Sequence, residues 1–198
     1  MIYETLQILK EQLDTYLNDA GLGNIVTLNN IAMLESGSDS ASDLEDKVII
    51  SLINIDEERS LKNVPAVKLV NNQAEYSNPP VNLNLFIMIS AYCDSYENSL
   101  LSISKTIELF QGKRVFTSAN TVYKRSSASM VELDSFKFIL ELYTPSFEIW
   151  NHIWGTLGGR QLPAVIYRVQ LIKIDAEKTL ASNALITEIN GTLNNLTK

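Results

Sequence analysis

Cysteine and histidine are nearly absent from this chain of 198 residues, which contains one of each, Cys93 and His152. A single cysteine excludes an intrachain disulfide and is typical of a protein that folds in a reducing compartment. One cysteine and one histidine are too few ligands for a structural zinc site. A Ser-His-Asp or Cys-His catalytic machine would have to use His152, whose neighbours in FEIWNHIWG are mostly apolar. We therefore interpret His152 as a packing or surface residue.

Long apolar runs and an excess of basic residues are also missing. The longest apolar candidate, residues 83–91, contains Asn84 and Ser90 and falls far short of the roughly 18 residues that a membrane-spanning helix needs. The N-terminal sequence MIYETL has none of the features of a signal peptide. Lys and Arg total 16 against 23 Asp and Glu, so the net charge is −7 and disfavours binding to nucleic acid or to an anionic membrane. We expect no nucleic-acid partner, no membrane insertion and folding in the cytoplasm.

The residues that are present indicate an ordinary globular domain, since 45% are apolar and 20% are charged. Apolar residues spaced by three and four predict helices, and alternating or continuous β-branched runs predict strands. The predicted helices cover residues 2–18, 94–111 and about 145–157, and the predicted strands cover 24–33, 47–55, 64–70, 81–92, 129–143 and 164–174. This order predicts an α+β (mixed α/β) fold, a single domain in which helices pack against a mixed or antiparallel sheet.

Local signals indicate where two of these helices begin and end. Asp94 or Ser95 suits the N-cap of the second helix, because a short polar side chain there can accept a hydrogen bond from a free backbone N–H. Thr144 followed by Pro145 is typical of an N-cap and a first helical residue. The pair Gly158-Gly159 then predicts the end of the third helix.

The sequence predicts two loops and a C-terminal extension. Residues 35–46 are small and acidic, and residues 71–80 are rich in turn formers, so we expect both at the surface. We place the domain at residues 1–175. Residues 176–198 form a C-terminal extension, whose apolar spacing suits either a terminal strand or a helix.

The candidates for chemistry in this sequence are weak. Asp56-Glu57-Glu58 could perform acid–base work, but adjacent carboxylates at the end of a strand are usually a solvated turn. The acidic loop 39–46 lacks the glycine and the final glutamate of a calcium-binding loop. Gly155–Arg160 follows a helix and lacks the Lys-Ser/Thr ending of a phosphate loop. We therefore expect no catalytic residues, no metal and no cofactor, and a protein that is not an enzyme.

Asparagine residues occur in or beside very apolar strands, at Asn54, Asn63, Asn82 and Asn84. A buried amide has to be hydrogen-bonded, because its desolvation is otherwise uncompensated. Our hypothesis is that these amides fix a loop or a strand contact between subunits.

Three segments of the sequence, taken together, resemble a known family. Val48–Asn63 contains SLINI-x-E-E, Asn78–Gln111 contains N-P-P-V-x-L-N-L, A-Y-x-x-x-Y and F-Q, and Leu140–Asp175 contains I-W-x-x-L-G. In this order they resemble the N-terminal domain of the tail-terminator, or cap, proteins of bacterial extracellular contractile injection systems. These are phage-tail-like particles of the antifeeding prophage and Photorhabdus virulence cassette type, and the domain was formerly one of unknown function. The resemblance covers roughly residues 1–190 and departs at Ala164, where we expect a serine after Pro163.

The resemblance implies a structural role without turnover. Six copies would form a homo-hexameric ring that ends the inner tube and the sheath, with the tube protein and the sheath protein as partners. The chain would assemble in the bacterial cytoplasm, become part of the particle and could leave the cell with it, and it would be a short form of the family. The residues that carry the motifs are Asn54, Glu57, Glu58, Asn63, Pro80, Asn84, Tyr92, Tyr96, Phe110, Gln111, Trp154, Gly158, Pro163 and Tyr167. The candidates for assembly contacts in the acidic loop are Ser38, Asp39, Asp43 and Glu45.

Two alternatives to the terminator role stay open at the level of sequence. The first is another structural or assembly component of the same particle, such as a chaperone or a baseplate piece. The second is a small-ligand-binding domain, which would need a deep pocket with converging polar groups.

Overall fold

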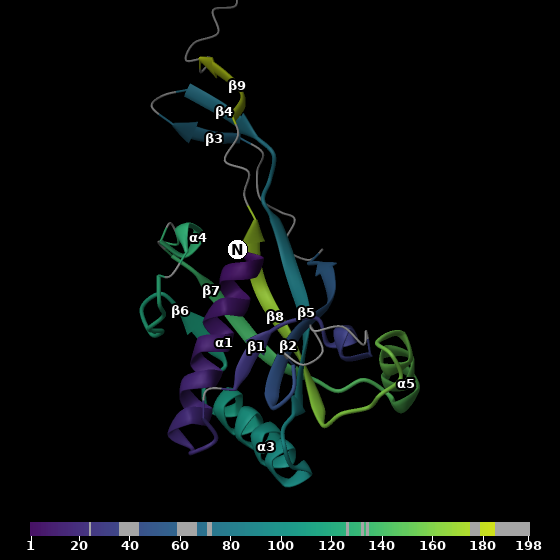
Figure 1. Cartoon of the computed structure of the whole chain (residues 1–198). Helices are drawn as coiled ribbons and strands as arrows, with labels where there is room; N and C mark the ends of the chain where they lie inside the picture. Colours follow the sequence, from purple (N-terminus) through teal and green to yellow (C-terminus); the bar gives the residue numbers. More distant parts are fainter. Residues whose placement is uncertain are drawn as a thin grey trace, which may run out of the picture.

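The apolar segments predicted as strands assemble into one mixed six-stranded sheet in a computed structural model of the chain (Figure 1). The structure describes residues 1–23, 25–35, 44–58, 67–70, 73–125, 127–131, 133, 135–174 and 179–184. The strands are β1 (Val26–Leu28), β2 (Lys47–Glu57), β3 (Val67–Val70), β4 (Gln73–Ser77), β5 (Val81–Tyr92), β6 (Val115–Thr117), β7 (Lys137–Tyr143), β8 (Ala164–Ile174) and β9 (Thr179–Ala184). The helices are α1 (Ile2–Asp19), the 3-10 helix η1 (Ile31–Glu35), α3 (Tyr96–Gly112), α4 (Ala128–Val131) and α5 (Phe147–Thr156).

The large sheet has the strand order β1-β2-β5-β8-β7-β6. β1 pairs with β2 in parallel, whereas the pairs β2–β5, β5–β8, β8–β7 and β7–β6 are antiparallel. The long strands β2, β5 and β8 therefore form the centre, and the short strands β1 and β6 lie at the edges. This arrangement confirms the predicted α+β fold with helices on a mixed sheet.

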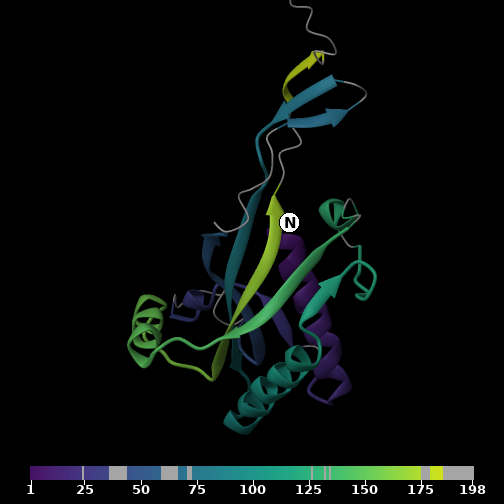
Figure 2. The same cartoon turned by 180° about the vertical axis from the view of Figure 1, so that it is seen from behind.

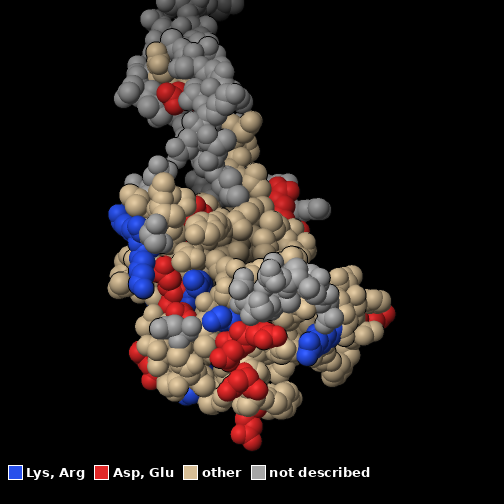
Figure 3. All heavy atoms as spheres, viewed as in Figure 1, with Lys and Arg blue, Asp and Glu red and all other residues tan. Residues whose placement is uncertain are grey.

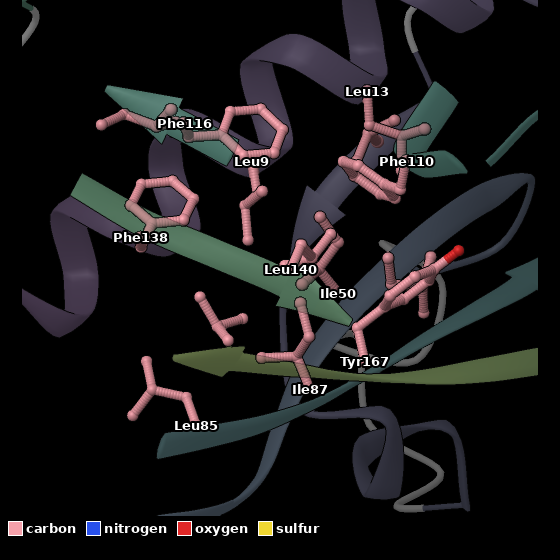
Figure 4. Close-up of a cluster of buried hydrophobic side chains, with 14 of the residues drawn as sticks. Leu9, Leu13, Ile50, Leu85, Ile87, Phe110, Phe116, Phe138, Leu140 and Tyr167 are labelled. Carbon is pink, nitrogen blue, oxygen red and sulfur yellow. The ribbon is translucent and has the colours of Figure 1, made fainter. Parts of the chain in front are cut away.

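One face of the large sheet is covered by α1 and α3, and the main core lies beneath them (Figures 1 and 4). Leu9 and Leu13 of α1 are fully buried because they share the helix face that meets the sheet. Phe110 of α3 contacts Tyr167 of β8 edge to face, with ring centres 5.3 Å apart. Phe138 of β7 stacks on Phe116 of β6 at 5.1 Å, which holds the edge strand on the sheet.

The opposite face carries a smaller cluster under η1 and α5, and Figure 2 shows α5 on the side away from α1 and α3. Met88 and Ile166 are buried there against Trp154. Trp154 is the residue of α5 whose side chain is almost completely buried. Beyond α5 this face is polar, because Arg168 and Gln170 both donate hydrogen bonds to Glu141. A helix thus covers only part of this face.

A second sheet of three strands, in the order β3-β4-β9, stands beyond the far ends of β5 and β8 (Figure 1). β4 pairs antiparallel with β3 on one side and with β9 on the other. β9 lies inside the predicted extension 176–198, so this part of the extension is a strand. The boundary at residue 175 stays a prediction.

Several local expectations were wrong, each for a physical reason. Ser146, not Thr144, caps α5, because the Ser146 Oγ accepts a hydrogen bond from the Ile149 N–H at 3.4 Å. The predicted strand over 129–143 begins only at Lys137, since Met130 lies in the short helix α4.

Short strands account for the remaining differences. The predicted strand over 24–33 contains only the three residues of β1 and then continues as η1. The predicted loop 71–80 contains β4, and β6 was not predicted at all. Each of these short strands is held by pairing with other strands, which the pattern of one short segment does not reveal.

Candidate assembly surfaces

The predicted motif residues Glu58 and Asn84 meet at the end of β2. Asn84 is buried, and its Nδ2 donates a hydrogen bond to Oε2 of Glu58 at 3.0 Å. The backbone N–H of Glu58 also donates to the carbonyl of Asn82 at 2.8 Å. Asn84 therefore ties the end of β2 to β5 within one chain, whereas its Oδ1 is buried without a hydrogen-bond partner among the described residues. The hypothesis that these amides fix a loop or a contact between subunits stays a prediction. Asn54 is exposed, and Asn63 lies outside the described residues.

A second pair of motif residues, Phe110 and Tyr167, belongs to the main core. Burial raises the pKa of the Tyr167 phenol to about 12, because the phenolate would lose its hydration. Gln111 follows Phe110 on the exposed side of α3, where its Oε1 accepts a hydrogen bond from Nη2 of Arg114 at 2.5 Å. These residues place the end of α3 on the sheet.

A third group of motif residues lies around the segment that follows α5. The guanidinium of Arg160 lies over the ring of Tyr92 at 5.3 Å, and the carbonyl of Pro163 accepts a hydrogen bond from the N–H of Ala91 at 2.9 Å. Gly158 follows α5 with a φ of 110°, a conformation that favours glycine. This group fixes the return of the chain from α5 to β8.

The remaining predicted residues do not converge on one site. Tyr96 is exposed beside a hollow that Pro163 also lines, Pro80 is half-buried before β5, and Glu57 is exposed at the end of β2. Glu45 is exposed in the turn before β2. Ser38, Asp39 and Asp43 lie outside the described residues.

The two residues with reactive side chains do not meet either. His152 is exposed on α5, whereas Cys93 is half-buried at the start of the segment before α3. Burial raises the pKa of the Cys93 thiol, which disfavours the nucleophilic thiolate. Among the described residues, no group of three or more His, Cys, Asp or Glu is arranged to hold a metal ion, and no helix there is long and apolar enough to cross a membrane.

Exposed apolar side chains gather around α5. Phe147 at its first turn is 93% exposed, and Ile149 is also exposed. A hollow of about 290 Å³ between α5 and the end of β7 is lined by Phe147, Trp150 and Tyr143, among others. Two aromatic residues of α5 therefore differ in environment: Trp154 is in the core, and Phe147 is at the surface.

Among the described residues, two edges of the large sheet also lack a neighbouring strand over part of their length. β1 pairs with β2 only as far as Ile50, and β6 pairs with β7 only from Lys137 to Ile139. Beyond these points the exposed apolar side chains include Ile55 on β2 and Leu142 on β7. In the sequence, the only sign of these edges is the presence of apolar residues near the ends of long strands. This pattern does not show whether a neighbouring strand covers those residues.

Charge is dispersed over the face of the body that Figure 3 shows. There, described Lys and Arg side chains lie singly or in small groups beside Asp and Glu. Two of the described pairs of opposite charge, Lys105 with Glu108 and Arg168 with Glu141, are hydrogen-bonded. The described surface therefore presents apolar edges and mixed charge, which suit protein–protein contacts.

The fold is a mixed α+β fold that two solved structures share. The chain is similar to the sheath/tube terminator of the extracellular contractile injection system PVC in its extended state, with a TM-score of 0.65 and 14% identity over 100% of this chain and 64% of that one. It is also similar to the tube-terminating cap of the anti-feeding prophage, with a TM-score of 0.60 and 14% identity over 92% of this chain and 58% of that one. At this identity the likeness shows a shared fold, and this chain spans less than two thirds of each of those two chains.

The chain belongs to the Pvc16 N-terminal domain family, whose model matches residues 4–188. The resemblance found in the sequence is thereby confirmed at the level of the family. The comparison with curated proteins finds no significant match.

Proposed function

We propose that this chain is a tail terminator, a structural protein that ends the inner tube and sheath of a phage-tail-like contractile particle. The observation that carries the proposal is the family match over residues 4–188, together with a fold shared with a sheath/tube terminator and a tube-terminating cap. The chain would act as a homo-hexameric ring, assemble in the cytoplasm and bind the tube and sheath proteins without catalysing a reaction. The division into a domain of residues 1–175 and an extension of residues 176–198 is part of this proposal.

The surface of the chain supports this role. A ring of identical copies needs two different faces of each subunit that fit each other. Within the described residues, the strand edges at Ile55 and at Leu142, on opposite sides of one sheet, have exposed apolar side chains and no paired strand, and they could supply two such faces. The exposed apolar side chains around α5, with Phe147 foremost, offer a further surface for the tube or the sheath.

Deletion of the gene tests the proposal by negative-stain electron microscopy of the particles. We expect particles from deletion cells to have uncontrolled or broken tubes without a terminal cap, and we expect the intact gene to restore uniform length. Uniform, capped particles without the gene would contradict the terminator role.

A second readout separates the terminator from another component of the same particle. An epitope tag inserted beside Val122, which is 88% exposed, should be labelled by gold-bound antibody at the particle end opposite the baseplate. Label at the baseplate, or on immature particles only, would favour a baseplate piece or an assembly chaperone.

A further inference from the structure

Two hollows adjoin each other between α3 and α5, at the end of the sheet where β8 begins (Figures 1 and 2). The first, of about 290 Å³, lies against α5 and the end of β7. The second, of about 450 Å³, extends from α5 to the start of α3. Trp150 and Ala164 line both hollows, so their linings form one continuous surface, which we call the α3–α5 surface.

The composition of the α3–α5 surface is uncharged and rich in aromatic residues. Among the described residues that line the two hollows, none carries a charge. Phe147 is 93% exposed and Tyr96 is 69% exposed, and Tyr143 and Leu100 are also exposed. Large exposed apolar side chains without charged neighbours are typical of the centre of a protein–protein interface.

Contacts within the chain hold the floor of this surface in place. Trp150 packs edge to face against the buried Trp154, with ring centres 6.1 Å apart. Tyr143 packs in the same way against Phe86 at 5.1 Å. Ser146 caps the first turn of α5. Because these side chains are already ordered, a partner that binds here loses little of its binding free energy to the ordering of this chain.

Carboxylates lie at both ends of the α3–α5 surface. Glu148 directly follows Phe147 in the first turn of α5, and Asp94 and Glu97 lie close to Tyr96 in the sequence at the start of α3. All three carboxylates are exposed. Among the described residues, none of them forms an ion pair with a lysine or an arginine. Their charges are therefore available to a basic partner.

Basic side chains are fewer in this region. Arg160 follows α5, where its guanidinium lies over the ring of Tyr92 at 5.3 Å. Lys47 begins β2 beside the exposed Asp46, whose Oδ1 accepts a hydrogen bond from the N–H of Asp94 at 3.1 Å. The named carboxylates outnumber these two cations, so the apolar surface has an acidic rim.

We infer that the α3–α5 surface binds a segment of another protein of the particle, in which apolar side chains are flanked on both sides by Lys or Arg. Two of the apolar side chains occupy the hollows on either side of Trp150. A basic residue at one end of the segment lies near Glu148, and a basic residue at the other end lies near Asp94 and Glu97, so that opposite charges meet around an apolar centre. The inference rests on the proposed function, because it looks for the partner among the other proteins of the particle.

Photo-cross-linking in assembled particles tests the chemistry of the partner. The photoreactive residue p-benzoylphenylalanine replaces the exposed Phe147, the particles are purified from the source cell and irradiated, and the cross-linked peptides are sequenced by mass spectrometry. We expect one segment of another particle protein, with apolar residues between Lys or Arg. The matched control carries the same residue at Val122, which is 88% exposed in the loop after β6, and should not capture this segment.

The outcomes of this experiment are distinct. The inference is overturned by the absence of a cross-link in particles that contain the protein, by a cross-link to a second copy of this chain, or by a captured segment without the basic and apolar pattern. If the variant at Phe147 stays out of the particles, Tyr96 at the other end of the surface takes the photoreactive residue, and the same outcomes apply.

Reversal of the rim charges tests the electrostatic part of the inference. Glu148→Lys combined with Glu97→Lys should lower the cross-link yield at least about fivefold, because like charges then meet. Asp19→Lys reverses an exposed carboxylate at the end of α1, far along the chain from both hollows, and should leave the yield unchanged. Thermal unfolding checks that each variant is folded. A yield that survives the double reversal would contradict the role of the acidic rim.

A peptide probe separates failure of this contact from failure of the proposed function. The purified chain is titrated with fluorescein-labelled Lys-Leu-Phe-Gly-Leu-Lys and with its acidic counterpart Glu-Leu-Phe-Gly-Leu-Glu, and binding is followed by fluorescence anisotropy. We expect the basic peptide to bind at least about tenfold more tightly, and Phe147→Ser to remove this binding. Equal binding of both peptides, or binding that Phe147→Ser leaves unchanged, would overturn the docking surface even if gene deletion disturbs the particles. Selective binding supports the surface even if gene deletion leaves the particles unchanged.

Discussion

The two faces of the six-stranded sheet differ in how completely they are covered. Under α1 and α3 the buried side chains form one large cluster that reaches from β2 to β6. Under η1 and α5 the cluster is smaller, and the sheet beside it carries the polar group of Glu141, Arg168 and Gln170. The difference indicates that the first face contributes most of the packing that holds the fold, whereas the described part of the second face is less completely covered.

The largest expected contrast between the two faces comes from two phenylalanines. Phe138→Ala removes a fully buried ring from the first face and should lower the free energy of unfolding by about 3–5 kcal/mol. Phe147→Ala removes an exposed ring from α5 and should change the free energy of unfolding by less than about 0.5 kcal/mol. Urea denaturation of both variants measures the contrast, and equal losses would refute the division of roles.

The pH dependence of stability sharpens the same comparison. Because burial raises the pKa of Tyr167 from 10 to about 12, the folded chain holds this proton more tightly than the unfolded chain does. This stabilisation is complete below pH 10 and is lost as the pH rises towards 12. Urea denaturation from pH 9 to 11.5 should show a steeper fall for the wild type than for Tyr167→Phe. Parallel curves would mean that the phenol is not buried.

A smaller effect is expected from the amide that joins two central strands. Asn84→Ala removes the hydrogen bond to Glu58 and leaves its carboxylate without this donor, which should cost about 1–2 kcal/mol of unfolding free energy. Asn54→Ala is the matched control, because Asn54 is exposed on the neighbouring strand. This substitution should change the free energy of unfolding by no more than about 0.5 kcal/mol. Thermal unfolding compares the two, and a control as destabilised as Asn84→Ala would remove the special role of this amide.

The smallest effect is expected on the second face. Glu141→Gln weakens an exposed ion pair with Arg168, and exposed pairs contribute less than about 1 kcal/mol. We expect the free energy of unfolding of the variant to differ from that of the wild type by about a few tenths of a kcal/mol. This difference should disappear at high salt, which screens exposed charges. A large, salt-independent loss would show that the polar group holds the fold together after all.

Sequence reasoning succeeded where the signal was local and repeated. The spacing of Leu9, Leu13 and Leu17 was sufficient for α1, and Ser95 was one of two predicted caps for α3. The long apolar runs of β2, β5 and β8 were predicted for the same reason, since burial on both faces leaves a continuous apolar pattern. These elements form most of the core.

The rest depends on contacts between distant segments. β4 and β6 are short and polar or mixed, so only their partners reveal them as strands. The open edges at Ile55 and Leu142 follow from strand order and from where β1 and β6 stop, and neither is encoded locally. The family resemblance predicted which residues to examine, yet most of them proved to be parts of the framework, as Asn84 and Tyr167 show.

Cryo-electron microscopy of the particle end opposite the baseplate tests the central claim most directly. The account predicts density for a closed ring of copies of this fold at the end of the tube. An end without this fold, or the fold located elsewhere in the particle, would contradict the terminator role.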